Sequence, residues 1–386
     1  MNKVKFNSTM NVYYVCQHIV TSLGLDTESN VEKILANQSG IQINNNPEWT
    51  TEPTPLSVLD REPIYNTIQK EYTFFEKLAV YSIEKALSKQ NLFPISSAET
   101  LIILSTTKGN IELLDTAKAE KFEEGRINLA SSGEIIRQHF KNPNPVLVIS
   151  NACISGVLAL IAGMRKIKQG HYKHIVAVGI DVMSHFVVSG FQSFKSLSPT
   201  ICKPFDAKRD GLSLGEGVGT ILLTSDCNLA DSSKIILVNG ATANDANHIS
   251  GPSRTAEGQF YAMQRTLFDW HQAIDFISAH GTATPYNDDM ESIAIHRHNL
   301  NHVKTNSFKG FFGHTLGAAG IIETALSIYG LQNKIMFGTY GLENEGTVEK
   351  ITVLKQSIDK EYQTVLKLAS GFGGSNAALL IHQLNS

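Results

Sequence analysis

Hydrophobic and polar residues follow two different periods along this chain, and near residue 150 they predict a strand, a turn and a helix. Residues 146–150 (VLVIS) are a short run rich in β-branched side chains, which predicts a buried strand. Small and polar residues interrupt the run at 151–156 (NACISG), and residues 157–170 then predict a helix that ends at Gly170. Residues 171–181 predict the next strand.

The same order of elements occurs again in the second half of the chain. Residues 303–334 (VKTNS, FKGFFGHTLGAAG, IIETALSIYGLQNK) predict a strand, a small-residue turn and a helix. Each half closes on a glycine-rich turn that enters a strand, at 215–225 and at 371–383. A repeat at a spacing of roughly 160 residues predicts an internal duplication.

This duplication also predicts the domain organisation. The polar, turn-prone segment 225–234 (SDCNLADSSK) is the expected junction, so the expected units are residues 1–225 and 235–386. Alternating strands and helices predict the α/β class, with mainly parallel sheets and helices on their faces. Ala and Gly are frequent in the two repeated helices, around 159–163 and 317–320. Because small side chains let helices approach closely, these two helices are expected to pack together between the sheets.

The N-terminal third is less regular. Residues 62–92 predict one long amphipathic helix, and residues 101–110 predict a strand that enters a loop. Residues 145–164 carry no charge and have about the length of a membrane span. Their β-branched run and small-residue break predict a buried strand, turn and helix instead. The start of the chain lacks the charged lead and apolar run of a signal peptide, so a cytoplasmic protein is expected.

Composition and charge exclude several classes of function. Hydrophobic residues make up 42% and charged residues 18% of the 386 residues, which is typical of a globular protein with a large interior. The formal net charge is -3 and there is no long basic run, which argues against a general nucleic-acid binder. The four Cys are scattered without a Cys-x-x-Cys pair, so neither a disulfide framework nor a metal site is expected. The glycines of 211–219 precede a strand and lack the spacing of a dinucleotide-binding turn.

Three residues are candidates for chemistry. Cys153 lies where a strand turns into a helix, and the positive end of a helix dipole favours the thiolate, which is the nucleophile. On position alone Cys153 could equally be a small buried residue. His280 follows the apolar stretch 275–279, and His314 lies at the start of the helix that repeats the one after Cys153. If the two helices pack around a pseudo-two-fold axis, Cys153 and His314 converge.

Five motifs in this order resemble those of the elongating β-ketoacyl-[acyl carrier protein] synthases. They are NACISG (151–156), PFDAKRDGLSLGEGVG (204–219), HGTATPYNDDME (280–291), KGFFGHTLGAAG (309–320) and GFGGSN (371–376). The resemblance runs from about residue 146 to the C-terminus, and more faintly through the N-terminal third. It implies the thiolase fold, in which duplicated α/β halves form a five-layer αβαβα sandwich. It implies no metal and no cofactor.

The resemblance also implies a role for each matching residue. Cys153 would accept an acyl group from an acyl carrier protein, and His280 and His314 would hydrogen-bond the thioester carbonyl of a malonyl unit. The supporting residues would be an ion pair, two structural carboxylates and a gating aromatic whose backbone N–H joins that of Cys153 in an oxyanion hole: Lys309, Glu323, Asp288, Glu291 and Phe372. Ile154, Thr282 and Thr284 are expected to line the substrate pocket.

The implied reaction is a decarboxylative Claisen condensation of an acyl group held on Cys153 with malonyl-[acyl carrier protein]. The product would be a β-ketoacyl-[acyl carrier protein]. Departures from the family's pattern, Asn151, Ile154 and Asn287, leave both fatty acid synthesis and a specialised polyketide or polyene pathway open. A thiolase is disfavoured, because it needs a second catalytic cysteine near the C-terminal glycine-rich motif and no Cys follows Cys227.

The alternative function is a non-elongating partner, similar to a chain-length factor, within a ketosynthase heterodimer. Such partners usually lose the nucleophile, whereas Cys153 is present here. The resemblance implies a homodimer, or a heterodimer with a related chain, and an acidic carrier protein that docks on a basic patch. Two groups of basic residues could form that patch: Arg165, Lys166 and Lys168, or Lys203, Lys208 and Arg209.

Overall fold

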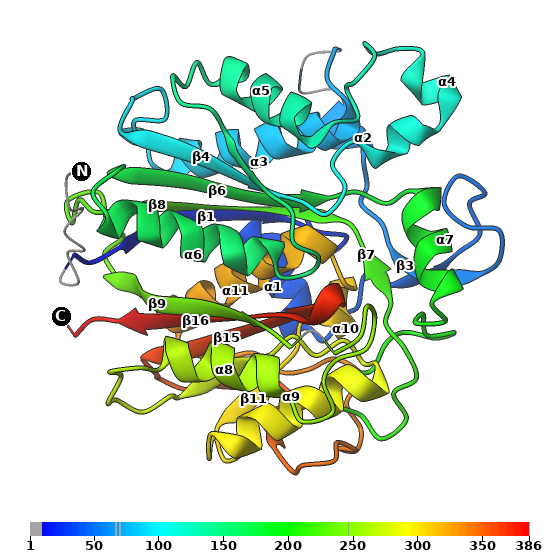
Figure 1. The fold of residues 1–386 in the computed structure, drawn as a ribbon, viewed down its shortest axis with the longest axis vertical. Coiled ribbons are helices and arrows are strands. Elements are labelled where there is room, and N and C mark those ends of the chain that lie inside the picture. Colours follow the sequence, from blue (N-terminus) through cyan, green and yellow to red (C-terminus); the bar gives the residue numbers. More distant parts are fainter. Residues whose placement is uncertain (1–9, 66–67, 69–70, 246, 386) are drawn as a thin grey trace.

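The computed structural model describes residues 10–65, 68, 71–245 and 247–385, and these form five layers. From top to bottom in Figure 1, two helices cover a sheet, two helices fill the centre, and a second sheet is covered by two more helices. The helices of these layers are α3 (Phe74–Lys89), α5 (Leu129–His139), α6 (Ser155–Lys168), α11 (Ala319–Asn333), α8 (Glu257–Thr266) and α9 (Pro285–Arg297). The predicted five-layer αβαβα sandwich is confirmed.

The strands of both sheets run in the order β13-β11-β10-β15-β16-β9-β1-β8-β6-β4-β5, and the two sheets join at the pair Tyr13 and Ile236. The strands before the 225–234 segment are β1 (Tyr13–Val20), β4 (Thr100–Ser105), β5 (Leu147–Ile149), β6 (His174–Asp181) and β8 (Gly217–Thr224). The strands after it are β9 (Ile235–Asn244), β10 (Phe276–Ser278), β11 (Lys304–Asn306), β13 (Thr352–Val353), β15 (Thr364–Gly371) and β16 (Ser375–Gln383).

The prediction of mainly parallel sheets is wrong for the strands that follow the glycine-rich turns. β4 is parallel to β5 and β6, but β8 is antiparallel to both β6 and β1. In the other sheet β10 is parallel to β11 and β15, but β16 is antiparallel to β15 and β9. Only three residues separate β15 from β16, and so short a connection permits only an antiparallel pair.

Shorter elements connect these layers. They are α1 (Thr27–Leu35), β2 (Gln42–Asn44), β3 (Thr54–Ser57), α2 (Glu62–Tyr65), η1 (Ile111–Leu114), α4 (Thr116–Ala119), α7 (His185–Ser193), β7 (Leu214–Gly215), α10 (Lys309–Phe312), η2 (Leu316–Ala318), β12 (Ile335–Met336), β14 (Ile358–Asp359) and η3 (Phe372–Gly374).

The two central helices approach each other through their backbones. A Cβ atom on Gly320 of α11 would lie 2.3 Å from the backbone nitrogen of Val157 in α6. A Cβ atom on Gly156 would lie 2.8 Å from the nitrogen of Ile321. Neither position has room for a side chain, so the prediction that small residues bring these helices together is confirmed. Gly163 serves another contact, because its Cβ would meet Ile175 of β6 at 2.9 Å.

The prediction of one helix over residues 62–92 is wrong. Residues 62–65 form α2, the segment at 66–67 and 69–70 lies outside the described residues, and α3 begins at Phe74. The start of α3 is fixed by a capping box: Oγ1 of Thr73 accepts from the N–H of Glu76, and a carboxylate oxygen of Glu76 accepts from the N–H of Thr73. The fully buried Glu76 carboxylate also pairs with Arg126 at 2.7 Å. These contacts start a new helix at Phe74, so residues 62–92 do not form one continuous helix.

The charge-free segment 145–164 contains β5, a turn and most of α6, as predicted. Among the described helices, none combines the length and the apolar character that crossing a membrane would require.

Candidate active site

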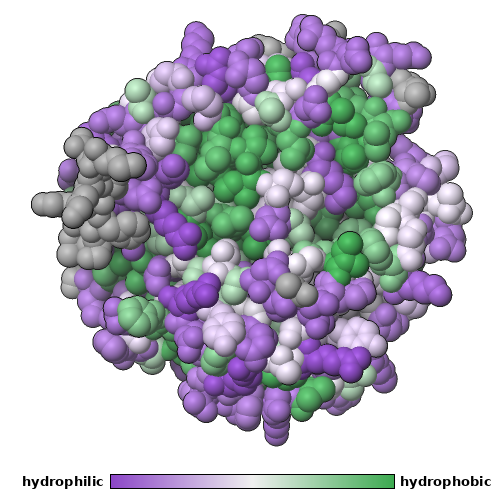
Figure 2. Space-filling view, viewed as in Figure 1, coloured by the Kyte–Doolittle hydropathy of each residue, from purple (hydrophilic) through white to green (hydrophobic). Residues whose placement is uncertain are grey.

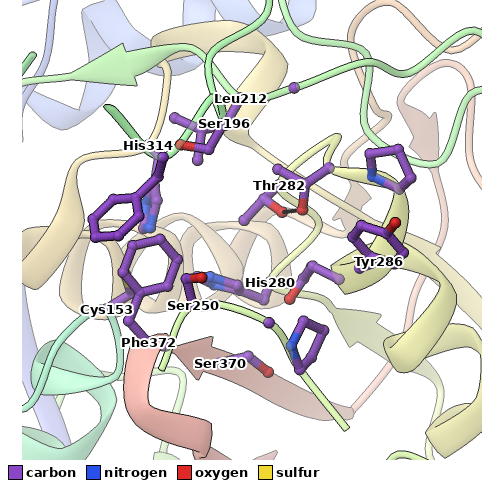
Figure 3. A pocket seen from close by; sticks show the side chains of 18 of the residues that line it. Cys153, Ser196, Leu212, Ser250, His280, Thr282, Tyr286, His314, Ser370 and Phe372 are labelled. Atoms are coloured by element: carbon purple, nitrogen blue, oxygen red, sulfur yellow. Dashed lines mark hydrogen bonds between the residues drawn. The ribbon is translucent and has the colours of Figure 1, made fainter. Parts of the chain in front are cut away.

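Three side chains from separate parts of the chain meet at one end of the central layer (Figure 3). Cys153 lies in the turn between β5 and α6, His280 follows β10, and His314 lies between α10 and η2. The sulfur of Cys153 and one ring nitrogen of each imidazole all lie within 4.8 Å of one another. The two imidazole rings are 5.0 Å apart and nearly perpendicular, at 83°. The structure therefore brings the candidate nucleophile and both candidate imidazoles together.

Cys153 lies on a strained turn. The preceding residue, Ala152, has a positive φ of 43°, and α6 begins two residues after Cys153, at Ser155. Non-glycine residues adopt such angles where the surrounding structure holds them, often at functional sites. Cys153 is 7% exposed. Burial raises the pKa of its thiol to about 11, although Lys108, Lys309 and the backbone N–H of Phe372 act in the opposite direction. Burial therefore outweighs the favourable charges in the net pKa, and the contribution of the helix terminus stays a prediction.

The glycine-rich turn after β15 packs directly on Cys153. A Cβ atom on Gly371 would lie 2.9 Å from the backbone nitrogen of Cys153. The ring of Phe372 stacks on Phe191 at 5.6 Å and meets Phe194 edge-on at 5.4 Å. Gly371 thus lets the backbone of Phe372 reach Cys153 while the aromatic ring closes one side of the site.

Two buried carboxylates hold the turn that carries His280. The carboxylate of Glu291 accepts from the N–H groups of His280 and Gly281, both at 2.6 Å. The carboxylate of Asp288 accepts from the N–H of Thr282 at 2.9 Å and from that of Phe205 at 2.7 Å. Burial raises the pKa of Glu291 to about 7 and that of Asp288 to about 6. These are the positions that the motif comparison assigned to structural carboxylates.

Two lysines share one glutamate behind His280. The ammonium group of Lys309 lies 2.7 Å from one carboxylate oxygen of Glu323, and that of Lys367 lies 2.5 Å from the other. All three side chains are at most 1% exposed. The sequence analysis anticipated the Lys309–Glu323 pair but missed Lys367. A lone lysine inside the apolar strand 364–371 was the available signal, because a charge in a buried strand requires a partner.

The hydrogen bonds around each imidazole fix its tautomer. The ammonium group of Lys309 lies 3.2 Å from Nδ1 of His280, and the N–H of Leu316 lies 3.3 Å from Nδ1 of His314. Because these partners donate, Nδ1 accepts in both rings and the proton of the neutral ring is on Nε2. Nε2 of His314 is buried and has no hydrogen-bond partner in the described part of the chain.

The electrostatic surroundings keep both imidazoles neutral. Burial lowers the pKa of His280 and of His314 well below the usual value, and the charge of Lys309 lowers both further. Two neutral rings thus present Nε2–H donors to the space beside Cys153. Such donors suit a reaction in which negative charge develops on an oxygen atom.

A cavity of about 390 Å³ opens from these residues to the surface. Thr282 and Thr284 line it, and their hydroxyl groups are 2.8 Å apart. Phe191 is also part of its wall, as are Leu212 and Tyr286 (Figure 3). Ile154 does not line this cavity, contrary to the expectation. It is the residue before the first turn of α6, and its side chain is 1% exposed within the core between the helices and the sheets.

The sequence matches a known family over most of its length. Residues 69–227 match the family described as Beta-ketoacyl synthase, N-terminal domain, and residues 235–343 match Beta-ketoacyl synthase, C-terminal domain.

Individual relatives have related names. A putative mitochondrial 3-oxoacyl-[acyl-carrier-protein] synthase of Schizosaccharomyces pombe is 27% identical over 93% of this chain and 96% of its own length. A 3-oxoacyl-[acyl-carrier-protein] synthase 2 of Rhizobium meliloti is 32% identical over 68% of this chain and 66% of its own length. Among solved structures, a ketosynthase in complex with its chain length factor from Xenorhabdus doucetiae has a TM-score of 0.82. That match is 23% identical and covers 97% of this chain and 98% of the other.

Proposed function

We propose that this chain, which belongs to the β-ketoacyl synthase family, extends an acyl group held on Cys153 by one malonyl unit delivered on an acyl carrier protein. It is an acyltransferase of fatty acid or specialised polyketide synthesis. The observation that carries the assignment of residues is the convergence of one buried thiol and two neutral imidazoles at the inner end of a cavity.

In the first half-reaction the sulfur of Cys153 attacks the carbonyl carbon of an acyl thioester. The C–S bond to the carrier breaks, and the proton of the Cys153 thiol ends on the departing carrier thiol. Backbone N–H groups of Cys153 and Phe372 would stabilise the oxyanion, since Gly371 lets the two backbones approach each other.

In the second half-reaction the malonyl thioester loses carbon dioxide, and the electron pair of the broken C–C bond forms an enolate. Nε2–H of His280 and of His314 would donate to the enolate oxygen, and each such donor is typically worth about 3 kcal/mol of barrier. The enolate carbon then attacks the acyl carbon on Cys153. The C–S bond breaks, and the Cys153 thiolate takes up a proton.

The alternative, a partner subunit that only shapes a neighbouring pocket, does not require these contacts. Such a subunit has no use for a nucleophile, two oriented imidazoles and the buried ion pair of Lys309 and Glu323 in one place. Their presence together supports the elongating enzyme.

The carrier protein would dock on Lys203 and Lys208 and not on Arg165, Lys166 and Lys168, whereas Arg209 is 6% exposed and pairs with Asp289, so it would support this surface from beneath. A guanidinium nitrogen of Arg209 lies 3.5 Å from the carbonyl oxygen of Pro285, which lines the cavity. The other group lies in the last turn of α6, a helix of 14 residues and therefore about 21 Å long, whose first turn follows Cys153. We expect Lys208→Glu to raise the KM for carrier-bound substrate and the matched control Lys166→Glu to leave it unchanged.

A second chain would pair across the edge strand β5. Among the described strands, β5 contacts β4 on one edge only, and Leu147, Val148 and Ile149 are half-buried. Figure 2 shows that hydrophobic side chains gather on the upper half of the molecule, the half that carries α3, α5 and β4 in Figure 1. An unpaired edge beside an apolar surface supports a dimer, with an identical or a related chain.

The decisive experiment is intact-mass spectrometry after mixing the protein with a panel of acyl-carrier-protein thioesters. Wild type is compared with Cys153→Ser. An acyl adduct on wild type that is absent from the variant supports Cys153 as the acceptor and identifies the preferred acyl group. Absence of any adduct on a folded dimer would instead support the partner subunit.

A further inference from the structure

Lys367 occupies a central position beneath the site. It lies on β15 in register with Ser278 of β10 and is fully buried. Its ammonium group lies 2.5 Å from Glu323 and donates to the carbonyl oxygens of Ser278 at 3.2 Å and of Ala279 at 3.1 Å. The ammonium group thus donates two hydrogen bonds to backbone carbonyls and forms an ion pair with the Glu323 carboxylate.

Lys309 continues the same pattern by one residue. Its ammonium group donates to the carbonyl oxygen of His280 at 2.5 Å. The two lysines together therefore bind three consecutive carbonyl groups, those of Ser278, Ala279 and His280. The opposite groups of this segment are also held, since Glu291 and Asp288 accept from the N–H groups of residues 280–282. Buried cations and buried carboxylates thus clamp the segment that carries His280 from its two sides.

Lys367 also determines how Glu323 can act on Lys309. A buried carboxylate is costly unless its oxygen atoms have partners. Lys367 provides the partner for one oxygen, and the other oxygen is left to Lys309. Held in this way, Lys309 keeps its contact with Nδ1 of His280 and directs the proton of that ring to Nε2.

We propose that Lys367 is a positioning residue for the condensation half-reaction, acting through Glu323, Lys309 and the backbone of residues 278–280 on the orientation of His280. This inference rests on the proposed function. It assigns Lys367 no contact with the substrate and no part in the transfer of the acyl group to Cys153.

The charge of Lys367 adds a second consequence. The groups that it acts on are Glu323 of α11, Lys309 of α10, Glu291 of α9 and the two imidazoles. Its positive charge lowers the pKa of His280 and of His314, and it attracts the Glu291 carboxylate. Removal of this charge should therefore raise the pKa of all three groups. The acid side of the pH profile for condensation should then move to higher pH.

The test compares Lys367→Met with wild type in two separate assays. Methionine retains the length and the apolar stem of lysine without the charge. Transfer of an acyl group to Cys153 should stay within about twofold, whereas condensation with malonyl-[acyl carrier protein] should fall about 10- to 100-fold. The acid limb of the pH profile for condensation should move to higher pH. Leu366→Met is the matched control, because Leu366 is buried on the same strand but is part of an apolar core cluster that does not include Lys367, Glu323 or Lys309. Both half-reactions of this control variant should keep rates near those of wild type.

Equal losses in both half-reactions, or an unchanged pH profile, would make Lys367 a structural residue and overturn the proposal. If Lys367→Met does not fold, Glu323→Gln and the double variant Glu323→Gln with Lys367→Met decide, because the double variant leaves no unpaired carboxylate. A double variant no slower in condensation than Glu323→Gln supports action through Glu323, and a double variant much slower than Glu323→Gln contradicts it. Loss of acyl transfer in wild type itself would instead refute the proposed function.

Discussion

The two sides of the active site are held in place by different means. On the Cys153 side, backbone conformation and backbone packing position the thiol. Ala152 adopts a positive φ, and Gly371 allows a second backbone to lie against the nitrogen of Cys153. On the His280 side, buried charged groups bind the backbone and the ring, among them Glu291 and Lys309. The comparison indicates that acyl transfer depends on the shape of two turns, whereas condensation depends on buried charge. Variants should therefore separate the two half-reactions.

Replacing either imidazole by alanine should give the largest effect, and this effect should fall on condensation and not on acyl transfer. His314→Ala and His280→Ala each remove an Nε2–H donor, and condensation should fall by about 100- to 1,000-fold. Acyl transfer to Cys153, followed by intact mass, should continue. His298→Ala is a control, since His298 packs on Phe260 and is not part of the cavity wall. Equal loss of both half-reactions in His314→Ala would break the separation.

The reactivity of Cys153 sharpens the other side of the comparison. With a pKa of about 11, this thiol is almost entirely protonated at neutral pH. We expect iodoacetamide to label Cys153 about 100-fold more slowly at pH 7.5 than the exposed Cys227, since only the thiolate reacts. Peptide mapping over a pH series would measure both rates. Faster labelling of Cys153 than of Cys227 would contradict the dominance of burial over the favourable charges.

Gly371→Ala tests the backbone contact directly. The added Cβ would lie 2.9 Å from the nitrogen of Cys153, so the two turns must separate. Acyl transfer should slow by about tenfold through loss of alignment. Gly190→Ala is the matched control, because a Cβ atom there would meet no atom within 4 Å. A normal rate of acyl transfer in Gly371→Ala would show that close packing is not what holds Cys153.

The smallest expected effect concerns stability. The folded-state pKa of His314 lies below its unfolded value, so the folded state prefers the neutral ring. Its contribution to stability is complete above the unfolded value of about 6.5 and is lost as the pH falls below it. Urea titrations at pH 7.5 and pH 5.5 should show a smaller loss of stability in His314→Gln than in wild type. Equal losses would contradict the lowered pKa.

The sequence was sufficient to predict features that repeat or that follow from residue size. The duplicated strand, turn and helix predicted the layers, and Gly320 is one of the small residues that predicted close helices, whereas its counterpart Gly156 precedes the predicted group at 159–163. The order of the motifs placed Cys153, His280 and His314 in one family pattern, and the structure places them in one site. The division of the chain at residues 225–234 and the cytoplasmic location stay predictions.

The remaining features depend on contacts between distant residues. The helix start at Phe74 depends on the capping box of Thr73 and Glu76 and on Arg126, which is 50 residues away from Glu76. The burial of Lys367 is explained only by its ion pair with Glu323, and the two residues are distant in sequence. The raised pKa of the Cys153 thiol follows from burial, which no local pattern reveals. Ile154 shares a turn with Cys153, but its side chain points into the core.

The glycine contact between α6 and α11 has a consequence for engineering this protein. Where Gly156 and Gly320 meet, the two helices are in backbone contact, so the residues of the cavity wall do not set the spacing between the helix that follows Cys153 and the helix that follows His314. Residues of the cavity wall such as Phe191 and Leu212 can therefore be exchanged to admit longer or bulkier acyl groups. The distance between Cys153 and His314 should remain unchanged in such variants.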